Sequence, residues 1–310
     1  MNSIYFPLFL FTLFLFPALT FSQNITFEGK VISLDTKEPL PYTTIEIKAL
    51  QTGTYADDKG YFILSIPEKN LQDTLEVYCL GYEKKTMKMS ELTSSGIHTI
   101  ELINKVVPLK EVVIKPKKSK TIFVGSTETK PWSKEVANIF GAQKGCYLAN
   151  KKGKTGRIKA VSYYIFNLGF TNAPFRVRIY SFDREKKCPG ADLLKENVIV
   201  SNNNGPGWFK VNLTKYNLEF PNDGLYVMME WIYSGDQYYY DLEVTRKTKD
   251  GKSEKKEILK LYGPVLGALM KQKEGYISNR GLGTNWQKFD LYYKGYVNVM
   301  INAEVEIQPE

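Results

Sequence analysis

The chain has 310 residues, of which 43% are hydrophobic and 24% charged, with 21 Tyr, 17 Phe and a formal charge of +9. This composition excludes a chain that is disordered throughout, and no apolar run beyond the first twenty residues is long enough to span a membrane as a helix. A single histidine, His98, and three cysteines leave few side chains for a metal site or a catalytic triad.

The N-terminus has the pattern of an export signal. Residues 5–19, YFPLFLFTLFLFPAL, are almost unbroken apolar, and Thr20 and Ser22 supply small residues before a cleavage point. We therefore expect a signal peptide at residues 1–22 and no transmembrane span in the mature chain. No cysteine follows the apolar run, so we expect a protein without a lipid anchor that is periplasmic, associated with the outer membrane or secreted.

The next region, from residue 24 to residue 104, consists of short alternating runs separated by turn residues. Such runs, at a spacing of about ten residues, predict a β-sandwich with about seven strands. The turn Asp57–Gly60 places a glycine between two of these runs, which predicts a hairpin there.

These residues resemble a known family, the carboxypeptidase-like regulatory domain, a transthyretin-like β-sandwich of exported Gram-negative bacterial proteins. The resemblance runs from about Ile25 to Lys115 and rests on short motifs that occur in the family's order. They are Gly29–Val31, Thr36–Pro41, Thr52–Thr54, Gly60–Phe62, Gly81–Tyr82 and Leu109–Ile114. The resemblance implies a folding or interaction accessory that carries no catalytic residues.

The same domain often precedes outer-membrane receptors, but only 195 residues follow residue 115, too few for a receptor of that kind. The resemblance leaves such a receptor as a partner, bound by strand addition at a sheet edge. It does not imply peptidase activity, because His98 and Glu101 cannot form a three-ligand zinc site by themselves.

The positive charge is concentrated at the junction that follows this domain. Residues 105–157 carry 13 Lys and Arg against three Asp and Glu, mostly in the segments 115–120 and 151–157. We expect residues 116–120 to be a basic linker between a domain at 23–115 and another at 121–310.

Neither basic segment contains aromatic residues that could stack on bases, so we expect no nucleic-acid partner. An anionic envelope polymer or lipid headgroup is an alternative to a simple solvated linker.

Residues 121–310 again read as strands with Asn, Gly and Pro turns, which predicts a jelly-roll-like antiparallel sandwich. In Phe175–Tyr180 apolar and polar residues alternate strictly, so we expect one face of that strand to be solvated. Only residues 133–140 and 257–271 resemble helices. Pro264 and two glycines in the second of these segments favour short turns or a loop.

No nucleophile elbow, phosphate-binding glycine loop or other cofactor motif is present. We therefore predict a non-enzymatic binding or structural protein of the cell envelope. The alternative is a carbohydrate-active enzyme with a pair of carboxylates in the second domain. The candidates for that pair are Asp183, Glu185, Asp223, Glu230, Asp236 and Asp241.

Aromatic residues next to turns and carboxylates suggest a glycan site, because rings stack on the C–H faces of sugars while polar groups bind the hydroxyls. The predicted ligand-binding residues are Trp208, Tyr233, Asp236, Tyr239 and Trp286. Packing of these rings against the core is the alternative.

Three cysteines in an exported chain allow one disulfide at most, and we expect it to join Cys146 and Cys188. Three buried thiols that pack as small apolar groups are the alternative.

Overall fold

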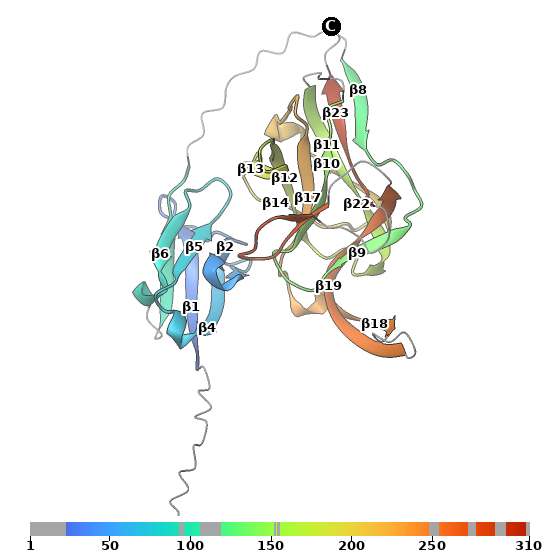
Figure 1. Ribbon diagram of the computed structural model, residues 1–310. Coiled ribbons are helices and arrows are strands. Elements are labelled where there is room, and N and C mark those ends of the chain that lie inside the picture. Colours follow the sequence, from blue (N-terminus) through green and yellow to red (C-terminus); the bar gives the residue numbers. More distant parts are fainter. Residues whose placement is uncertain are drawn as a thin grey trace, which may run out of the picture.

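The computed structural model describes residues 23–92, 96–105, 119–151, 153, 156–247, 254–271, 277–288 and 296–307. Within these ranges the regular structure is β-strand with short 3-10 turns, so the predicted all-β class is confirmed (Figure 1). The expected signal peptide and much of the two basic segments lie outside the described residues. The described part of the chain has no helix long and apolar enough to cross a membrane.

The first domain contains two sheets that enclose one core. One sheet has the order β4–β1–β7 and the other the order β3–β2–β5–β6. Their bounds are β1 (Asn24–Ser33), β2 (Thr44–Ile47), β3 (Thr52–Tyr55), β4 (Tyr61–Pro67), β5 (Thr74–Tyr78), β6 (Lys85–Lys88) and β7 (Ile97–Leu102). Along β4, Phe62, Leu64 and Ile66 are buried while the residues between them face outward, so a period of two directs the apolar side chains into the core. The prediction of about seven strands is confirmed.

The turn at Asp57–Gly60 forms as expected, but the hairpin prediction is wrong. Gly60 has φ +80°, and the Asp57 carboxylate accepts hydrogen bonds of 2.8 Å from the backbone N–H groups of Lys59 and Tyr61. The strands on either side, β3 and β4, belong to different sheets. The turn therefore carries the chain from one layer of the sandwich to the other, which a local alternating pattern cannot distinguish from a hairpin.

The second domain is a larger antiparallel sandwich. Its seven-stranded sheet has the order β13–β12–β17–β10–β20–β21, with β14 also paired to β12. Its nine-stranded sheet has the order β18–β19–β11–β23–β8, with β15 and β16 on β11 and with β9 and β22 on β19. The apolar faces of the two sheets form one core, in which Tyr163, Phe175 and Trp231 are among the largest buried side chains.

The bounds of these strands are β8 (Lys120–Gly125), β9 (Ser133–Ala137), β10 (Gln143–Leu148), β11 (Gly156–Gly169), β12 (Phe175–Asp183), β13 (Cys188–Asp192), β14 (Val198–Val200), β15 (Gly207–Asn212), β16 (Glu219–Phe220), β17 (Leu225–Trp231), β18 (Tyr239–Lys247), β19 (Glu254–Lys271), β20 (Ile277–Arg280), β21 (Gln287–Lys288), β22 (Tyr296–Val299) and β23 (Ile301–Ile307).

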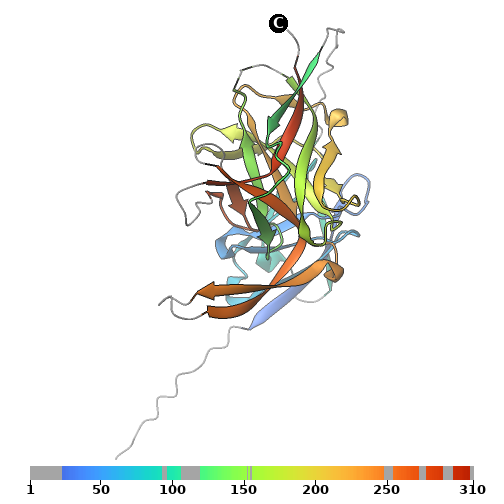
Figure 2. The same cartoon turned by 90° about the vertical axis from the view of Figure 1, so that its right-hand side faces the viewer.

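The segment predicted to be turns or a loop at 257–271 is instead most of the long strand β19, and residues 133–137 form β9. The register of β19 shifts between Tyr262 and Leu266, around Gly263 with φ +73° and Pro264. A bulge accepts a proline because the missing N–H is not needed for the ladder there. The Gly-Pro pair therefore bends the strand without ending it. Beyond this bend, β18 and β19 form a hairpin, the arm, that projects from the sandwich (Figures 1 and 2).

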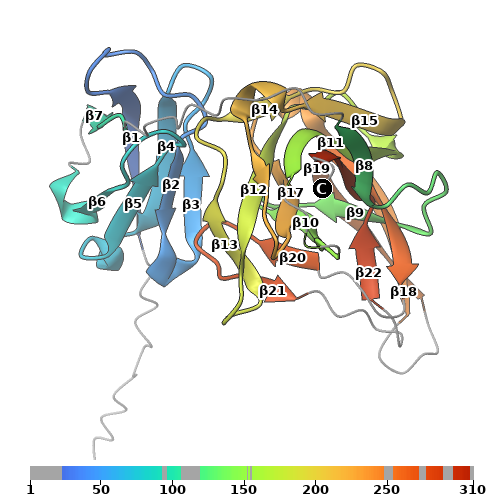
Figure 3. The ribbon, with the colours of Figure 1, turned by 90° about the horizontal axis from the view of Figure 1, so that it is seen from above.

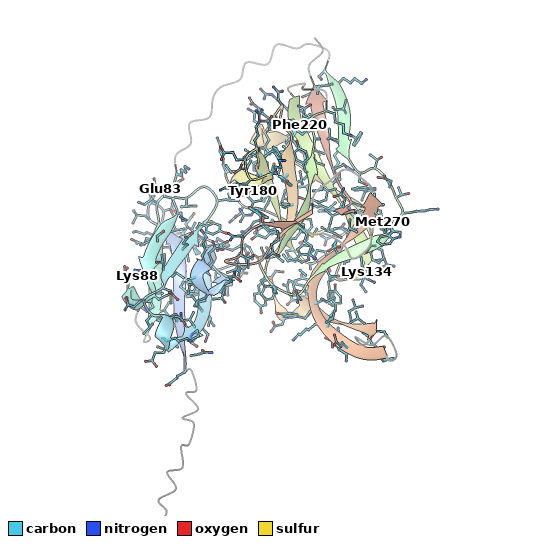
Figure 4. All side chains as sticks on the ribbon, viewed as in Figure 1. Glu83, Lys88, Lys134, Tyr180, Phe220 and Met270 are labelled. Atoms are coloured by element: carbon cyan, nitrogen blue, oxygen red, sulfur yellow. The ribbon has the colours of Figure 1, made fainter. Side chains whose placement is uncertain are left out.

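The face of β12 that was expected to be solvated is buried. Arg176 is 1% exposed, Arg178 3% and Tyr180 7%. The first domain lies beside this face, with β3 turned toward β13 and β12 in Figure 3, and Tyr180 is labelled on the same side of the second sandwich in Figure 4. The alternation of Phe175–Tyr180 correctly separates two faces of the strand, but both of them are covered.

A network of charged and polar side chains joins the two domains at this face. Arg176 on β12 lies opposite Glu230 on β17, and its guanidinium approaches the carboxylate at 3.5 Å. Arg178 donates from Nε to the same carboxylate at 2.5 Å and from Nη1 to Asp192 at 2.9 Å. From the first domain, the Tyr55 hydroxyl donates to Glu230 Oε1 at 2.6 Å. We call Tyr55, Arg176, Arg178, Asp192 and Glu230 the interface network.

Two further contacts extend the interface on either side of the network. Arg176 also donates to the backbone carbonyl of Tyr42, and the buried Glu46 carboxylate accepts the N–H of Gly283 at 2.9 Å. Leu80 of the first domain packs against the core of the second. The two sandwiches are therefore joined by hydrogen bonds and apolar contacts, while the ion pairs of the network lie within the second domain.

The pKa values of the two carboxyl groups in the interface network are shifted in opposite directions, one by burial and the other by the neighbouring charges. Burial by itself would raise the pKa of Glu230, but the guanidinium charges of Arg178 and Arg176 lower it from 4.5 to about 2. Burial raises the pKa of Asp192, although the nearby Arg178 acts against that shift. Glu230 is therefore an ionised structural group at neutral pH.

We predict that Glu230→Ala lowers the free energy of unfolding by about 3–5 kcal/mol, because it leaves two buried guanidinium groups without their shared carboxylate. Denaturant unfolding of the full mature chain measures this change. The control is Glu101→Ala, which removes an exposed ion pair with Lys37 and should change stability by less than about 1 kcal/mol. Equal losses in the two variants would contradict the stabilising role of the network.

The network also predicts a pH dependence. Since the pKa of Glu230 is lower in the folded chain than in the unfolded chain, its contribution is complete above about pH 4.5 and is lost as the pH falls toward about 2. The difference in free energy of unfolding between the wild type and Glu230→Gln should therefore be constant near neutral pH and shrink over that acidic range. A difference that is independent of pH down to pH 2 would refute this assignment.

Candidate functional site

A cluster of aromatic side chains surrounds Tyr262, at the point where β19 leaves the sandwich. The ring of Tyr262 is buried, and its centroid lies 4.8 Å from that of Phe140, 4.9 Å from that of Tyr239 and 6.2 Å from that of Tyr233. Phe140 also meets Tyr233 edge-on at 5.2 Å. Edge-to-face pairs of this kind are favoured by the ring quadrupoles. Phe140, Tyr233, Tyr239 and Tyr262 are called the ring cluster below.

The hydroxyl of Tyr262 fixes the loop that carries two of these rings. It accepts a hydrogen bond of 2.7 Å from the N–H of Ser234 and donates one of 3.2 Å to the carbonyl of Gly235. Gly235 has φ +127°, a conformation that glycine adopts without strain, and it precedes the 3-10 turn η5 (Asp236–Tyr238). The loop therefore folds back over Tyr262, with Tyr233 before the turn and Tyr239 after it.

The outer side of the ring cluster combines aromatic and charged groups. Tyr233 is 36% exposed, and its hydroxyl donates to the exposed Asp236 carboxylate at 2.9 Å. This hydrogen bond, with partial burial, raises the pKa of Tyr233. The Lys260 ammonium lies 4.5 Å from the centroid of the Tyr239 ring. Such a surface can stack on the apolar face of a sugar ring and bind its hydroxyls.

The segment that carries Phe140 also touches the first domain. The N–H of Gly141 donates to the carbonyl of Trp231 at 2.8 Å, and the N–H of Trp231 donates to the carbonyl of Ala142 at 3.0 Å. A Cβ atom on Gly141 would lie 2.6 Å from the Tyr55 hydroxyl. Glycine is required at this position, because its backbone has φ +78° and approaches Tyr55 closely.

The structure brings together three of the five predicted ligand-binding residues, namely Tyr233, Asp236 and Tyr239. Trp208 lies elsewhere, on β15, where its indole N–H donates to the carbonyl of Glu128 at 3.0 Å and its ring meets that of Tyr164. Trp286 packs edge-on against Tyr180 at 5.3 Å. The two tryptophans are thus partly buried in separate places, as the packing alternative describes.

Phe140 and Tyr262 were not among the predicted site residues. Both lie in the two segments that resembled helices, 133–140 and 257–271, the second of which was expected to be turns or a loop. The only feature of the sequence that could have identified them as site residues is a large aromatic residue next to a glycine. Many residues of a protein core share that feature.

The predicted disulfide between Cys146 and Cys188 is wrong for this structure. Both cysteines are thiols here; Cys146 is buried on β10 and Cys188 begins β13. Two strands, β12 and β17, lie between β10 and β13. Three interstrand spacings amount to about 14 Å, whereas the Cα atoms of a disulfide lie within about 7 Å of each other.

Four of the carboxylates considered for an enzyme accept hydrogen bonds from structural partners. Asp183 accepts the N–H groups of Glu185 and Lys186, and Asp223 is bound by the guanidinium of Arg184. Glu230 belongs to the interface network, and Asp236 binds Tyr233. Asp241 lies opposite Lys260 in the arm.

Possible metal ligands are equally scattered. Glu101 forms a 2.7 Å ion pair with Lys37. Over the residues that can be described, no group of three or more His, Cys, Asp or Glu side chains is placed to hold a metal ion.

Residues 27–114 match the family model of the CarboxypepD_reg-like domain. The match covers nearly the same residues as the resemblance seen in the sequence, which is therefore confirmed for the first domain. No curated protein matches the chain at a significant level.

Two solved structures show weak similarity to the whole chain. A crystal structure of a DUF3823 family protein from Bacteroides uniformis is 10% identical, with a TM-score of 0.19, and the similarity covers 93% of this chain and 100% of that chain. A structure of infectious bursal disease virus, Gt strain, is 9% identical with a TM-score of 0.18, and the similarity covers 93% of this chain and 65% of that chain. Scores this low do not establish a shared fold, so neither similarity bears on function.

The strand order predicts the redox state of the cysteines. When the purified mature chain is unfolded without a reducing agent and alkylated, we expect mass spectrometry to find Cys79, Cys146 and Cys188 all modified. Reducing agent should leave the melting temperature unchanged, since no covalent loop is present to break. A cross-linked peptide containing Cys146 and Cys188 would contradict the strand order described above.

Proposed function

We propose that this chain is an exported, non-enzymatic binding protein of the cell envelope and that it binds a glycan on the ring cluster. The observation that carries the proposal is the exposed side of that cluster, where Tyr233 and Tyr239 lie beside the carboxylate of Asp236. The buried Tyr262 holds these rings in place before a ligand arrives, which lowers the entropy cost of binding.

The surroundings of the carboxylates favour binding over hydrolysis. A glycoside hydrolase needs two carboxyl groups that flank one bond, with one of them able to give up a proton. Glu230 is ionised and enclosed by arginines, while Asp236 is exposed and bound to a tyrosine hydroxyl.

Export is supported by the apolar N-terminal run, residues 5–19. The first domain, as a regulatory-like domain, suits an accessory or docking role.

The test is binding of the full mature chain to a panel of envelope and dietary polysaccharides at two salt concentrations. We expect the double variant Tyr233→Ala, Tyr239→Ala to lose about tenfold or more in affinity, because both stacking rings are removed. Trp208→Ala is the matched control, since this ring lies outside the cluster and should not affect binding.

Two further outcomes separate the alternatives. Release of reducing ends from a bound polysaccharide, abolished by Asp236→Asn, would favour the carbohydrate-active enzyme. Failure of the wild type to bind any glycan, together with capture of an outer-membrane receptor that is lost on disruption of a first-domain sheet edge, would favour the protein partner.

A further inference from the structure

The face of the arm that carries Tyr239 and Tyr262 continues outward beyond the ring cluster. Cross-strand pairs in the arm are Tyr239 with Tyr262, Asp241 with Lys260, and Glu243 with Ile258. Side chains at alternate positions of a strand, and those directly opposite on its neighbour, lie on one face of the sheet. We call this surface the arm face; it is made of Tyr239, Asp241, Glu243, Lys256, Ile258 and Lys260.

The arm face offers apolar contact well away from the rings. Ile258 is 70% exposed, the highest exposure among the large hydrophobic side chains of the described residues. It lies four residues from Tyr262 on β19, which corresponds to about 13 Å along a strand. The surface that includes both the rings and Ile258 is therefore longer than a single sugar ring requires.

The charges on the arm face compensate one another. Glu243 forms a 2.8 Å ion pair with Lys256, and Asp241 lies directly opposite Lys260 in the ladder. Each lysine thus has a carboxylate next to it, so the surface presents hydrogen-bonding groups without a net field that would attract a polyanion. Hydroxyl groups can bind such carboxylates and ammonium groups, whereas a polyanionic chain gains little from them.

We propose that the arm face extends the ring cluster into a site for a linear, uncharged polysaccharide chain, with one sugar stacked on the rings and later sugars lying along β19 toward Ile258. This inference rests on the proposed function and specifies its ligand class. We infer a linear chain because the surface is longer than one sugar ring, and we infer an uncharged ligand because the carboxylates and lysines of the arm face balance one another.

The experiment measures affinity for oligosaccharides of increasing length prepared from the polysaccharide that the wild type binds. Affinity of the wild type should rise with length and then level off once the chain spans the arm face. Ile258→Ser should lower affinity for the long oligosaccharides by about fivefold, through loss of apolar contact, and leave the shortest unchanged. Raising the salt concentration should have little effect at any length.

The matched control is Val244→Ser. Val244 lies in the same arm, opposite Glu257 in the ladder, on the face that points away from Ile258. Affinity that is independent of length in the wild type, or equal losses in the Ile258 and Val244 variants, would overturn the arm-face site while leaving the ring cluster as a glycan site. Failure of the wild type to bind any polysaccharide of the panel would instead overturn the proposed function, and this inference with it.

Discussion

The arrangement of the two domains depends on how Arg176 and Arg178 are neutralised. Both extend from β12 away from the second core, and both reach the carboxylate of Glu230 on the neighbouring strand. Removing two guanidinium groups from water is costly unless partners surround them. The first domain contributes the Tyr42 carbonyl, which accepts from Arg176, and the Tyr55 hydroxyl, which donates to the shared carboxylate of Glu230. The regulatory-like domain therefore acts as a structural cover for a charged face of the second sandwich.

This interface is linked to the ring cluster through short stretches of chain. Glu230 precedes Trp231 on β17. The carbonyl of Trp231 accepts a hydrogen bond from the N–H of Gly141, and the N–H of Trp231 donates to the carbonyl of Ala142, so these bonds hold the segment that follows Phe140. The same glycine fits closely against Tyr55. The position of Phe140, and with it the packing of Tyr233 and Tyr239, is thus coupled to the contact between the domains. The proposed binding surface of the second domain depends in this way on the first.

The alternation of apolar and polar residues along the sequence predicted where strands form, but it did not predict which faces of those strands are buried. Alternation identified β4 and β12, and motifs such as Gly60–Phe62 identified the first domain, because backbone geometry and turn chemistry act over a few residues. The same alternation suggested a wet face at Arg176 and Arg178, which another domain buries. Gly263 and Pro264 suggested a loop, yet both lie in a bulge within the continuous strand β19. Tyr233, Asp236 and Tyr239 could be grouped because they are close in sequence, while Phe140 and Tyr262 could not.

The amino-acid sequence alone is enough to predict the all-β class, the family of the first domain and the residues of the loop Tyr233–Tyr239, since each depends on contacts between near neighbours in the chain. Tertiary structure alone decided the strand order, and strand order keeps Cys146 and Cys188 apart, places Glu230 between two arginines and brings Phe140 onto Tyr262. Those outcomes depend on which distant strands pair, and that choice is set by burial of the whole core and the interface rather than by any local run of residues.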